Sequence, residues 1–346
     1  MATISINAPN TRFYISTVPQ MPQITLQAMI QGIPIQAKPV FTWSFKLEYN
    51  DFIAVDGSRR RNVRTKVHPA MPNKTGNPVT VPLSTLMCGK LTVTVETMVD
   101  GKKLSATRND ILVGGTNPTA ADLRAMVPQS ILRKMIKQES GGKQFSDTSG
   151  GGWTAFAINP NWSGDNLRGV GLGQLTNPPP EDADIWNWRA NASDLQQRFR
   201  QKRAPAATLH ARIAASQRFL DEAKALNDWR AAEGQPPLQV SLPALDSGQQ
   251  DLEGLRAYNG FGIEVSGQYL HYIHEFEPAM TVLTSATRKG PGGQPLKSPA
   301  VLDVDVGGNA KWVQISGAER LRRYGGSGPG DPDYVAHVLS VCPKSS

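Results

Sequence analysis

Apolar and polar residues alternate in short runs over the first 114 residues, the pattern of β-strands with one buried face. The runs are ISINA, QITLQAMI, VFTWSFKLEY, KLTVTVETMV and KLSATRNDILVG. Asp100-Gly101 joins the last two, and this dipeptide is typical of a two-residue hairpin turn. Several short strands separated by turn residues predict an antiparallel β-sandwich over residues 1–114.

Trp43, inside VFTWSF, is a candidate core residue of an immunoglobulin-like sandwich. No Cys–Trp–Cys spacing supports a true immunoglobulin domain. The two cysteines, Cys88 and Cys342, are too few for a disulfide scaffold or a zinc site, and are either free thiols or one bridge. Because no catalytic cluster is visible before residue 115, we expect residues 1–114 to be a docking or binding domain.

Helical spacing of apolar positions replaces the alternation after a Gly-, Asn- and Pro-rich boundary at 114–122. Thr119 is a candidate N-cap, with Asp122 in the first turn. Residues 115–346 are therefore predicted to be a second, mainly α-helical domain that folds alone. Further helices are predicted at 182–203, 205–232, 249–258, 266–277 and in the closing YVAHVLSV, and a Gly- and Pro-rich excursion at 286–310.

The segment PQSILRKMIKQESGG places an acid at the end of an apolar helix. The helical stripe consists of Ile131, Leu132, Met135 and Ile136. Continuing it leads to Glu139, and Gly141 and Gly142 give the usual stop signal. The helix end and partial burial both disfavour a charged carboxylate, so we predict a raised pKa, as a general acid requires. Alternatively, Glu139 is a helix-end residue turned towards Lys137 or Lys143.

Two more short motifs follow in order. Gly171-Leu172-Gly173-Gln174-Leu175 comes after a long Gly-rich loop, and Ala257-Tyr258-Asn259-Gly260 ends a predicted helix. Together with the helix-end Glu-Ser, this order resembles the lytic transglycosylase family, a branch of the lysozyme-like superfamily that cleaves peptidoglycan. The resemblance covers about residues 119–285.

The resemblance implies a lysozyme-like domain after the sandwich, and so a multidomain α+β chain. It implies that Glu139 is the catalytic acid. It also implies that the glycan groove is lined by Ser140, Gly173, Gln174, Tyr258 and Asn259. Tyr324, in a Tyr-Gly-Gly turn, is an alternative counterpart of Tyr258.

The chain departs from the family pattern in four respects. Two long helices are predicted between the Gly-Leu-Gly-Gln turn and Ala-Tyr-Asn-Gly, and the tail after Ala-Tyr-Asn-Gly is unusually extended. The insert between Glu139 and the Gly-Leu-Gly-Gln turn is longer and richer in glycine, and Gly173 stands where the family often has methionine. Each proposed site residue also has a structural alternative. Ser140 could be a helix-end hydroxyl and Tyr258 a core residue. The insert's aromatic residues, Trp153, Phe156 and Trp162, either stack on sugar or hold the loop.

The family's mechanism uses one glutamate, first as acid and then as base, on the MurNAc–GlcNAc glycosidic bond. The sugar's own 6-hydroxyl attacks and leaves a 1,6-anhydro end. A hydrolase commonly needs a second carboxylate. Candidates are Asp147, Asp165, Asp182 and Asp184, each better explained as a solvated or capping residue. We therefore favour the transglycosylase over two alternatives, a muramidase and a non-catalytic wall-binding component.

The net charge of +8 and pI near 9.5 favour an anionic partner, which could be nucleic acid, an anionic membrane or an acidic cell-wall polymer. No nucleic-acid motif accompanies the basic residues, and no stretch of about twenty apolar residues could span a membrane. We expect no cofactor and no metal, since His271 and His274 are explained by a solvated helix face.

The N-terminal MATISINAPNTRFY lacks the pattern of a secretory signal. We therefore expect a protein made in the cytoplasm and carried by other machinery to the periplasm or wall of a target bacterium. Either a type VI secretion effector, with a cognate immunity protein, or a phage lysin or tail component fits this expectation.

Overall fold

A computed structural model of the chain forms two compact units, Met1–Leu195 with Pro343–Ser346, and Gln196–Cys342. The residues that it describes are 2–32, 39–54, 61–145, 169–176, 178–258, 270–272, 281–282, 300–304, 307–314 and 334–341.

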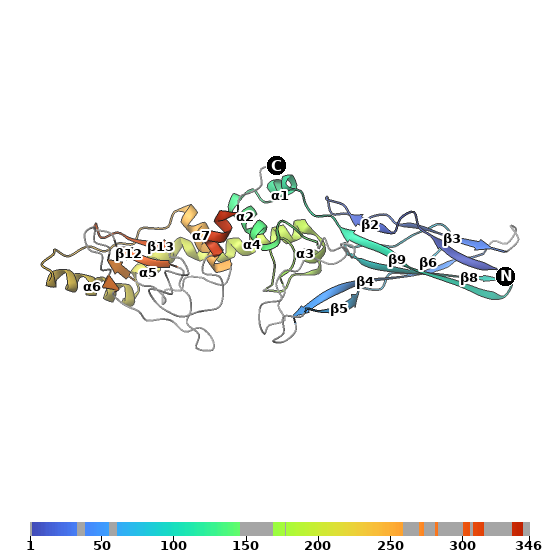
Figure 1. Ribbon diagram of the computed structural model, residues 1–346, viewed down its shortest axis with the longest axis horizontal. Coiled ribbons are helices and arrows are strands. Elements are labelled where there is room, and N and C mark those ends of the chain that lie inside the picture. Colours follow the sequence, from blue (N-terminus) through green and yellow to red (C-terminus); the bar gives the residue numbers. More distant parts are fainter. Residues whose placement is uncertain are drawn as a thin grey trace. The chain divides into compact units, whose positions relative to one another are not determined.

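The strands of the first unit form two sheets (Figure 1). Their bounds are β1 Thr3–Asn7, β2 Arg12–Ile15, β3 Thr25–Gln31, β4 Thr42–Ala54, β5 Arg61–Val67, β6 Lys74–Thr75, β7 Val79–Thr80, β8 Gly89–Val99 and β9 Lys102–Gly115. One sheet has the order β1-β3-β7 and the other β2-β9-β8-β4-β5, with β6 also paired to β4. The described pairings in these sheets are antiparallel except β2 with β9, which is parallel.

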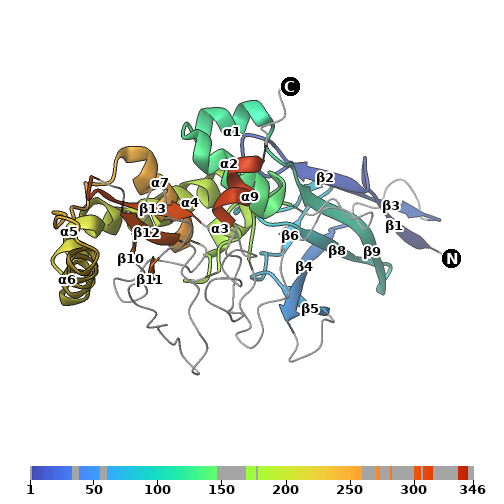
Figure 2. The same cartoon turned by 60° about the vertical axis from the view of Figure 1, so that its left-hand side comes forward.

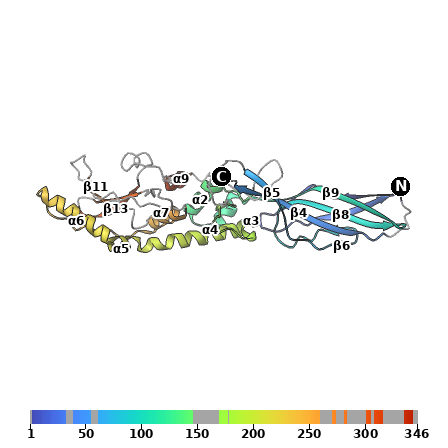
Figure 3. The same cartoon turned by 90° about the horizontal axis from the view of Figure 1, so that it is seen from below.

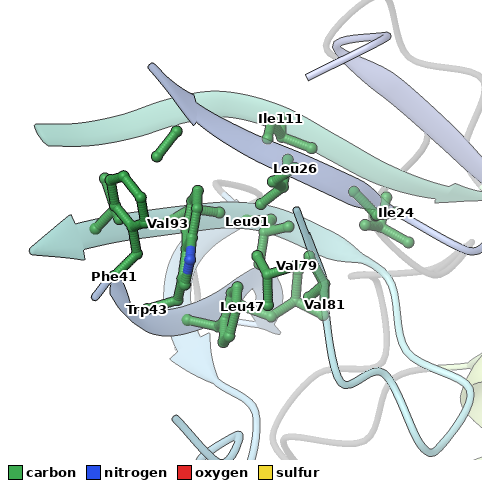
Figure 4. Packing of buried hydrophobic residues seen from close by; sticks show 14 of the residues in the cluster. Ile24, Leu26, Phe41, Trp43, Leu47, Val79, Val81, Leu91, Val93 and Ile111 are labelled. Atoms are coloured by element: carbon green, nitrogen blue, oxygen red, sulfur yellow. The ribbon is translucent and has the colours of Figure 1, made fainter. Parts of the chain in front are cut away.

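Both sheets contribute side chains to one apolar core (Figure 4). Leu26 and Val79 come from the smaller sheet, and Trp43 and Leu91 from the larger one. Strand β8 alternates buried and less buried positions along its length, as the sequence pattern predicts. Trp43 is fully buried and its indole N–H donates to the Gly76 carbonyl at 2.8 Å, so the prediction of a core tryptophan is confirmed. The immunoglobulin-like fold stays a prediction.

The predicted hairpin between β8 and β9 is confirmed. Asp100 and Gly101 join the two strands with φ values of 47° and 71°, both in the left-handed region that a type I′ turn requires. The strands pair from Val99 with Lys102 to Gly89 with Val113, with a register shift between Leu91 and Val93.

Helices of the first unit begin directly after β9. They are α1 Ala120–Met126, α2 Ser130–Ser140, α3 Asp182–Trp186 and the first part of α4 Trp188–Arg203. The predicted cap of α1 is confirmed, because the Thr119 hydroxyl accepts from the Asp122 amide at 3.1 Å and the Asp122 carboxylate accepts from the Thr119 amide at 2.8 Å. The change from strands to helices thus occurs near the predicted boundary, but the compact unit continues to Leu195.

A second apolar core joins the strands of the first unit to its helices. Its buried members are Ile15, Cys88, Phe145, Val170, Ile185 and Trp186. The Trp186 ring meets the Tyr49 ring edge-on at 5.0 Å, and the Trp188 indole N–H donates to the Thr17 carbonyl at 2.7 Å. We call this cluster with these two contacts the joining core.

The second unit combines short helices and short strands. Its elements are the end of α4, a 3₁₀ helix η1 Ala204–Thr208, α5 Leu209–Ala214, α6 Gln217–Ala232, α7 Ser247–Tyr258, β10 Leu270–Tyr272, β11 Thr281–Val282, β12 Ala300–Val304, β13 Ala310–Gln314 and α9 Tyr334–Ser340. The described strands form a sheet of order β11-β10-β12-β13, and Figure 2 shows β10, β12 and β13 as neighbours. Helices α5 and α6 follow one another along this unit (Figure 3).

Three predictions in the second unit need correction. The run 205–232 is not one helix, because Ser216 accepts a hydrogen bond from the Phe219 amide and starts a new helix there. The predicted helix at 266–277 is wrong at Leu270–Tyr272, which forms strand β10. Part of the predicted excursion at 286–310 is also ordered strand, since Ala300–Val304 pairs with β13.

Candidate functional site

Glu139 lies on the last turn of α2, as predicted. Leu132, Met135 and Ile136 are buried on the same helix, and Glu139 is partly buried. Gly141 ends the helix in the left-handed conformation, with φ of 66°, and its amide donates to the Lys137 carbonyl at 3.0 Å. The apolar stripe and the glycine stop signal are thus confirmed.

Ser140 is buried and its hydroxyl is used by the helix end. It donates to the Ile136 carbonyl at 3.0 Å and accepts from the Gly142 amide at 3.2 Å. These bonds satisfy backbone groups that a helix terminus otherwise leaves open. The contacts support the structural alternative for Ser140, and its contact with substrate stays a prediction.

The Gly-Leu-Gly-Gln motif forms a tight turn between Val170 and Leu175, whose backbones bond each other at 3.2 and 3.1 Å. We call residues 170–175 the glutamine turn. Gln174 has a positive φ of 47°, and its side-chain amide donates to the Gly171 carbonyl at 3.0 Å. A Cβ atom at Gly173 would overlap the Leu195 side chain. This packing disfavours a side chain at position 173.

Two buried amides that sequence reasoning missed hold the glutamine turn. Gln144 Oε1 accepts from the Leu172 amide at 3.2 Å, and Asn191 Oδ1 accepts from the Gly173 amide at 3.1 Å. Neither side chain has exposed surface. A signal for Asn191 exists in the sequence, since it lies at helical spacing from Trp188 and Leu195, so it is a polar residue on an apolar stripe.

The predicted site residues divide between the two units. Glu139, Ser140, Gly173 and Gln174 belong to the first unit. Tyr258 is the last residue of α7 in the second unit and is partly buried. The remaining predicted residues lie outside the described ranges: Asn259, Tyr324, Trp153, Phe156, Trp162, Asp147 and Asp165.

Of the two described candidates for a second carboxylate, Asp184 has a capping role. Its side chain accepts from the Glu181 amide at 3.1 Å in a capping box at the start of α3. Asp182 is exposed on the first turn of the same helix. Both positions fit helix-start residues, which prefer negative charge.

Glu253 on α7 is an acid that sequence reasoning did not select. It is buried beside Arg256, and their side chains form an ion pair. Burial raises the pKa of Glu253, and the Arg256 charge and hydrogen bond oppose this shift. Because the Glu253 carboxylate is buried and paired with Arg256, we assign Glu253 to the interior of the second unit.

Neither cysteine nor metal chemistry finds support in the described residues. Cys88 is a buried free thiol, and burial raises its pKa, so the reactive thiolate is disfavoured; Cys342 lies outside the described ranges. Within the part that the structure covers, no three histidine, cysteine or acidic residues gather as metal ligands, and no helix is long and apolar enough to cross a membrane.

Comparisons with known proteins give no family. No protein-family model matches the chain, and no curated protein matches it. Among solved structures, the sporulation control protein Spo0M from Bacillus subtilis is similar at 12% identity over 32% of this chain, with a TM-score of 0.19. The match spans 49% of that chain, about half its length. A likeness this weak carries no argument about fold or function.

Proposed function

We propose that this protein is a peptidoglycan-degrading lytic transglycosylase that cleaves the MurNAc–GlcNAc bond with Glu139. The observation that carries the proposal is the position of Glu139, partly buried on the last turn of α2 just before a left-handed glycine. The negative end of the helix favours the protonated acid there. The glutamine turn supports the proposal, because it binds Gln144, only five residues beyond the acid.

In the proposed reaction, the Glu139 carboxyl group donates its proton to the glycosidic oxygen as the bond between that oxygen and C1 breaks. The resulting carboxylate then takes the proton of the sugar's 6-hydroxyl, whose oxygen bonds to C1. The products are a free hydroxyl on the leaving sugar and a 1,6-anhydro ring, and no water is consumed. Glu139 ends protonated, ready for another cycle.

Among the described candidates for a second carboxylate, Asp184 is bound in a helix cap and Asp182 is exposed, and this supports the single-acid mechanism over hydrolysis. A muramidase would need a second carboxylate beside the bond. A wall-binding protein without turnover is the other alternative, and an intact Glu139 argues against it.

The proposed substrate requires delivery to the periplasm or wall of a target bacterium. Either a type VI secretion system or a phage particle would supply it. An effector would imply an immunity protein that blocks the groove, and the genes beside this one would distinguish the two routes.

Glu139→Gln tests the proposed function. The amide keeps the shape of the side chain but cannot donate a carboxylic proton, so solubilisation of purified sacculi should fall at least about a hundredfold. Gln138→Ala, an exposed change on the same helical turn, is the matched control and should keep full activity. Undiminished turnover in Glu139→Gln would remove the catalytic assignment.

Mass spectrometry of the same digests separates the alternatives. The transglycosylase should release anhydromuropeptides that are one water lighter than hydrolysis products. Reducing-end products alone would indicate a muramidase, and binding to sacculi without any product would indicate the non-catalytic component.

A further inference from the structure

The glutamine turn is held from both sides by side-chain amides that are completely buried. Gln144 comes from the segment after α2 and Asn191 from the first half of α4. Each accepts one backbone N–H of the turn, from Leu172 and from Gly173. Leu172 and Gly173 are buried, and the loss of a hydrogen-bond partner is costly at a buried N–H group.

The NH2 group of each side-chain amide also donates two hydrogen bonds. Gln144 Nε2 donates to the carbonyls of Asp184 and Ile185 at 2.9 Å each. Asn191 Nδ2 donates to the carbonyls of Val170 and Asp184 at 3.1 Å each. Carbonyl partners on one side and N–H partners on the other fix the orientation of each amide. The Asp184 carbonyl therefore accepts from both side chains and links them to α3.

Glycine at position 171 lets these amides approach the turn backbone. A Cβ atom there would overlap both the Gln144 and the Asn191 side-chain amides. Gly171 also has a positive φ of 70°. The turn backbone and the two side-chain amides are thus in direct contact. Movement of either side chain would therefore displace the turn.

Two backbone N–H groups of the segment between α2 and Gln144 are hydrogen-bonded, one of them to the end of α2. The backbone N–H of Gln144 donates to Asn117 Oδ1 at 2.8 Å. The backbone N–H of Lys143 donates to the Ser140 carbonyl at 3.3 Å. Ser140 adjoins Glu139 on the last helical turn. The segment from Glu139 to Gln144 is therefore held by hydrogen bonds near both of its ends.

We propose that Gln144 and Asn191 are positioning residues that fix the glutamine turn relative to the end of α2, and thereby set the affinity of the site for the glycan strand. This inference rests on the proposed function, in which the turn contacts the sugar and Glu139 performs the chemistry. Loss of either amide should loosen the turn and weaken glycan binding, while the pH dependence of kcat, which reports the acid, stays unchanged.

The test measures sacculus binding in a Glu139→Gln background, where turnover does not interfere, and KM and kcat in the active enzyme. Asn191→Asp keeps the volume and the acceptor for Gly173 but places a carboxylate oxygen against two carbonyls. Gln144→Glu does the same on the other side. We expect glycan affinity to fall and KM to rise on the order of tenfold for each variant, since about two neutral hydrogen bonds are lost, with a smaller change in kcat.

A pH series supplies a measurement that a purely structural role would not change. A buried carboxyl group that faces carbonyls has a raised pKa and regains a donor when it is protonated. Glycan affinity of Asn191→Asp should therefore recover towards that of the parent as the pH is lowered. Thr97→Val is the matched control, because it removes a hydrogen bond from the hydroxyl of a buried residue of β8 to the Val40 carbonyl at 2.8 Å.

The control should lower the melting temperature without changing glycan affinity. If Asn191→Asp and Gln144→Glu are folded and bind sacculi as tightly as their parent, the positioning role is wrong while the proposed function stands. If the wild-type protein neither cuts nor binds sacculi, the proposed function fails and the inference fails with it. Should one variant not fold, the other decides the same question from the opposite side of the turn.

Discussion

His68 lies where strands and helices of the first unit meet. Its Nε2 is 2.9 Å from the Cys88 carbonyl, and its ring centroid lies 4.6 Å from that of Tyr49 and 5.3 Å from that of Trp186. A carbonyl partner requires that Nε2 carry a proton, which the neutral ring satisfies. Burial lowers the pKa of His68, although the Cys88 carbonyl and the Asp182 charge oppose this shift.

The lowered pKa predicts a dependence of folding stability on pH. The unfolded chain binds a proton on His68 near its ordinary pKa of about 6.5, where the folded protein does not. Stability is therefore complete above that pH and falls as the pH is lowered towards the folded pKa. Denaturant unfolding between about pH 5 and 8 should show this loss, and His68→Phe should reduce it.

His210 in α5 is the comparison for this experiment. Burial lowers the pKa of His210 too, against an opposing hydrogen bond to the Pro243 carbonyl. It belongs to the second unit, so His210→Phe should leave the pH dependence of the first unit's unfolding unchanged. An equal effect of both substitutions on that transition would contradict the assignment to His68.

At the scale of elements, the sequence predicted the features that neighbouring residues determine. The capping box at Thr119, the Asp100-Gly101 turn and the glycine end of α2 are each specified by neighbouring residues, and each was found. Strand β10 was missed because its identity depends on pairing with the distant β12, in which Leu270 pairs with Leu302. Distant pairing overrides a local helical pattern.

The residues of the candidate site also differ in whether local sequence predicts their position. Glu139 could be placed because one helix positions it. The roles of Gln144 and Asn191 could not be predicted, because their partners are backbone groups of other segments. Gln144, for example, binds the Asp184 carbonyl 40 positions away. Only the folded chain brings these groups together.

Gly141 gives a prediction for the end of α2. A Cβ atom there would meet no atom within 4 Å, so the cost of Gly141→Ala is backbone strain alone. With φ at 66°, the substitution should destabilise the first unit by about 1 kcal/mol. Gly141→Asn should cost less, since asparagine tolerates this conformation better. Denaturant unfolding of both variants checks the order, and equal losses would point to a cause other than φ.

For the whole molecule, the joining core changes the expectation for truncation. Residues 115–346 were predicted to fold and act alone, with 1–114 reserved for docking or delivery. Yet Phe145 and Trp186 pack with Ile15 and Cys88, which such a fragment would lack. Large apolar side chains would then be exposed to water, at a cost of roughly 1.5–3 kcal/mol each.

We therefore predict that the fragment 115–346 is poorly folded and has little activity on sacculi. Circular dichroism melting and binding of a hydrophobic dye, compared with the full chain, measure this. Trp186→Ala in the full chain should lose about 3–5 kcal/mol of unfolding free energy, because its ring lies in that core. A fragment that melts cooperatively and cuts at the full-length rate would instead restore the separable-domain arrangement.

The hydrogen bond from Trp188 to Thr17 also bears on how the chain acquires its structure. It joins residues 171 positions apart, so the first unit has contacts of very large sequence separation. Folding rates fall as such separations grow, because the entropy of closing a long loop is lost before its contacts form. On the ribosome, the joining core cannot close until the chain has been synthesised past Trp188, and its apolar side chains must wait until then for their partners.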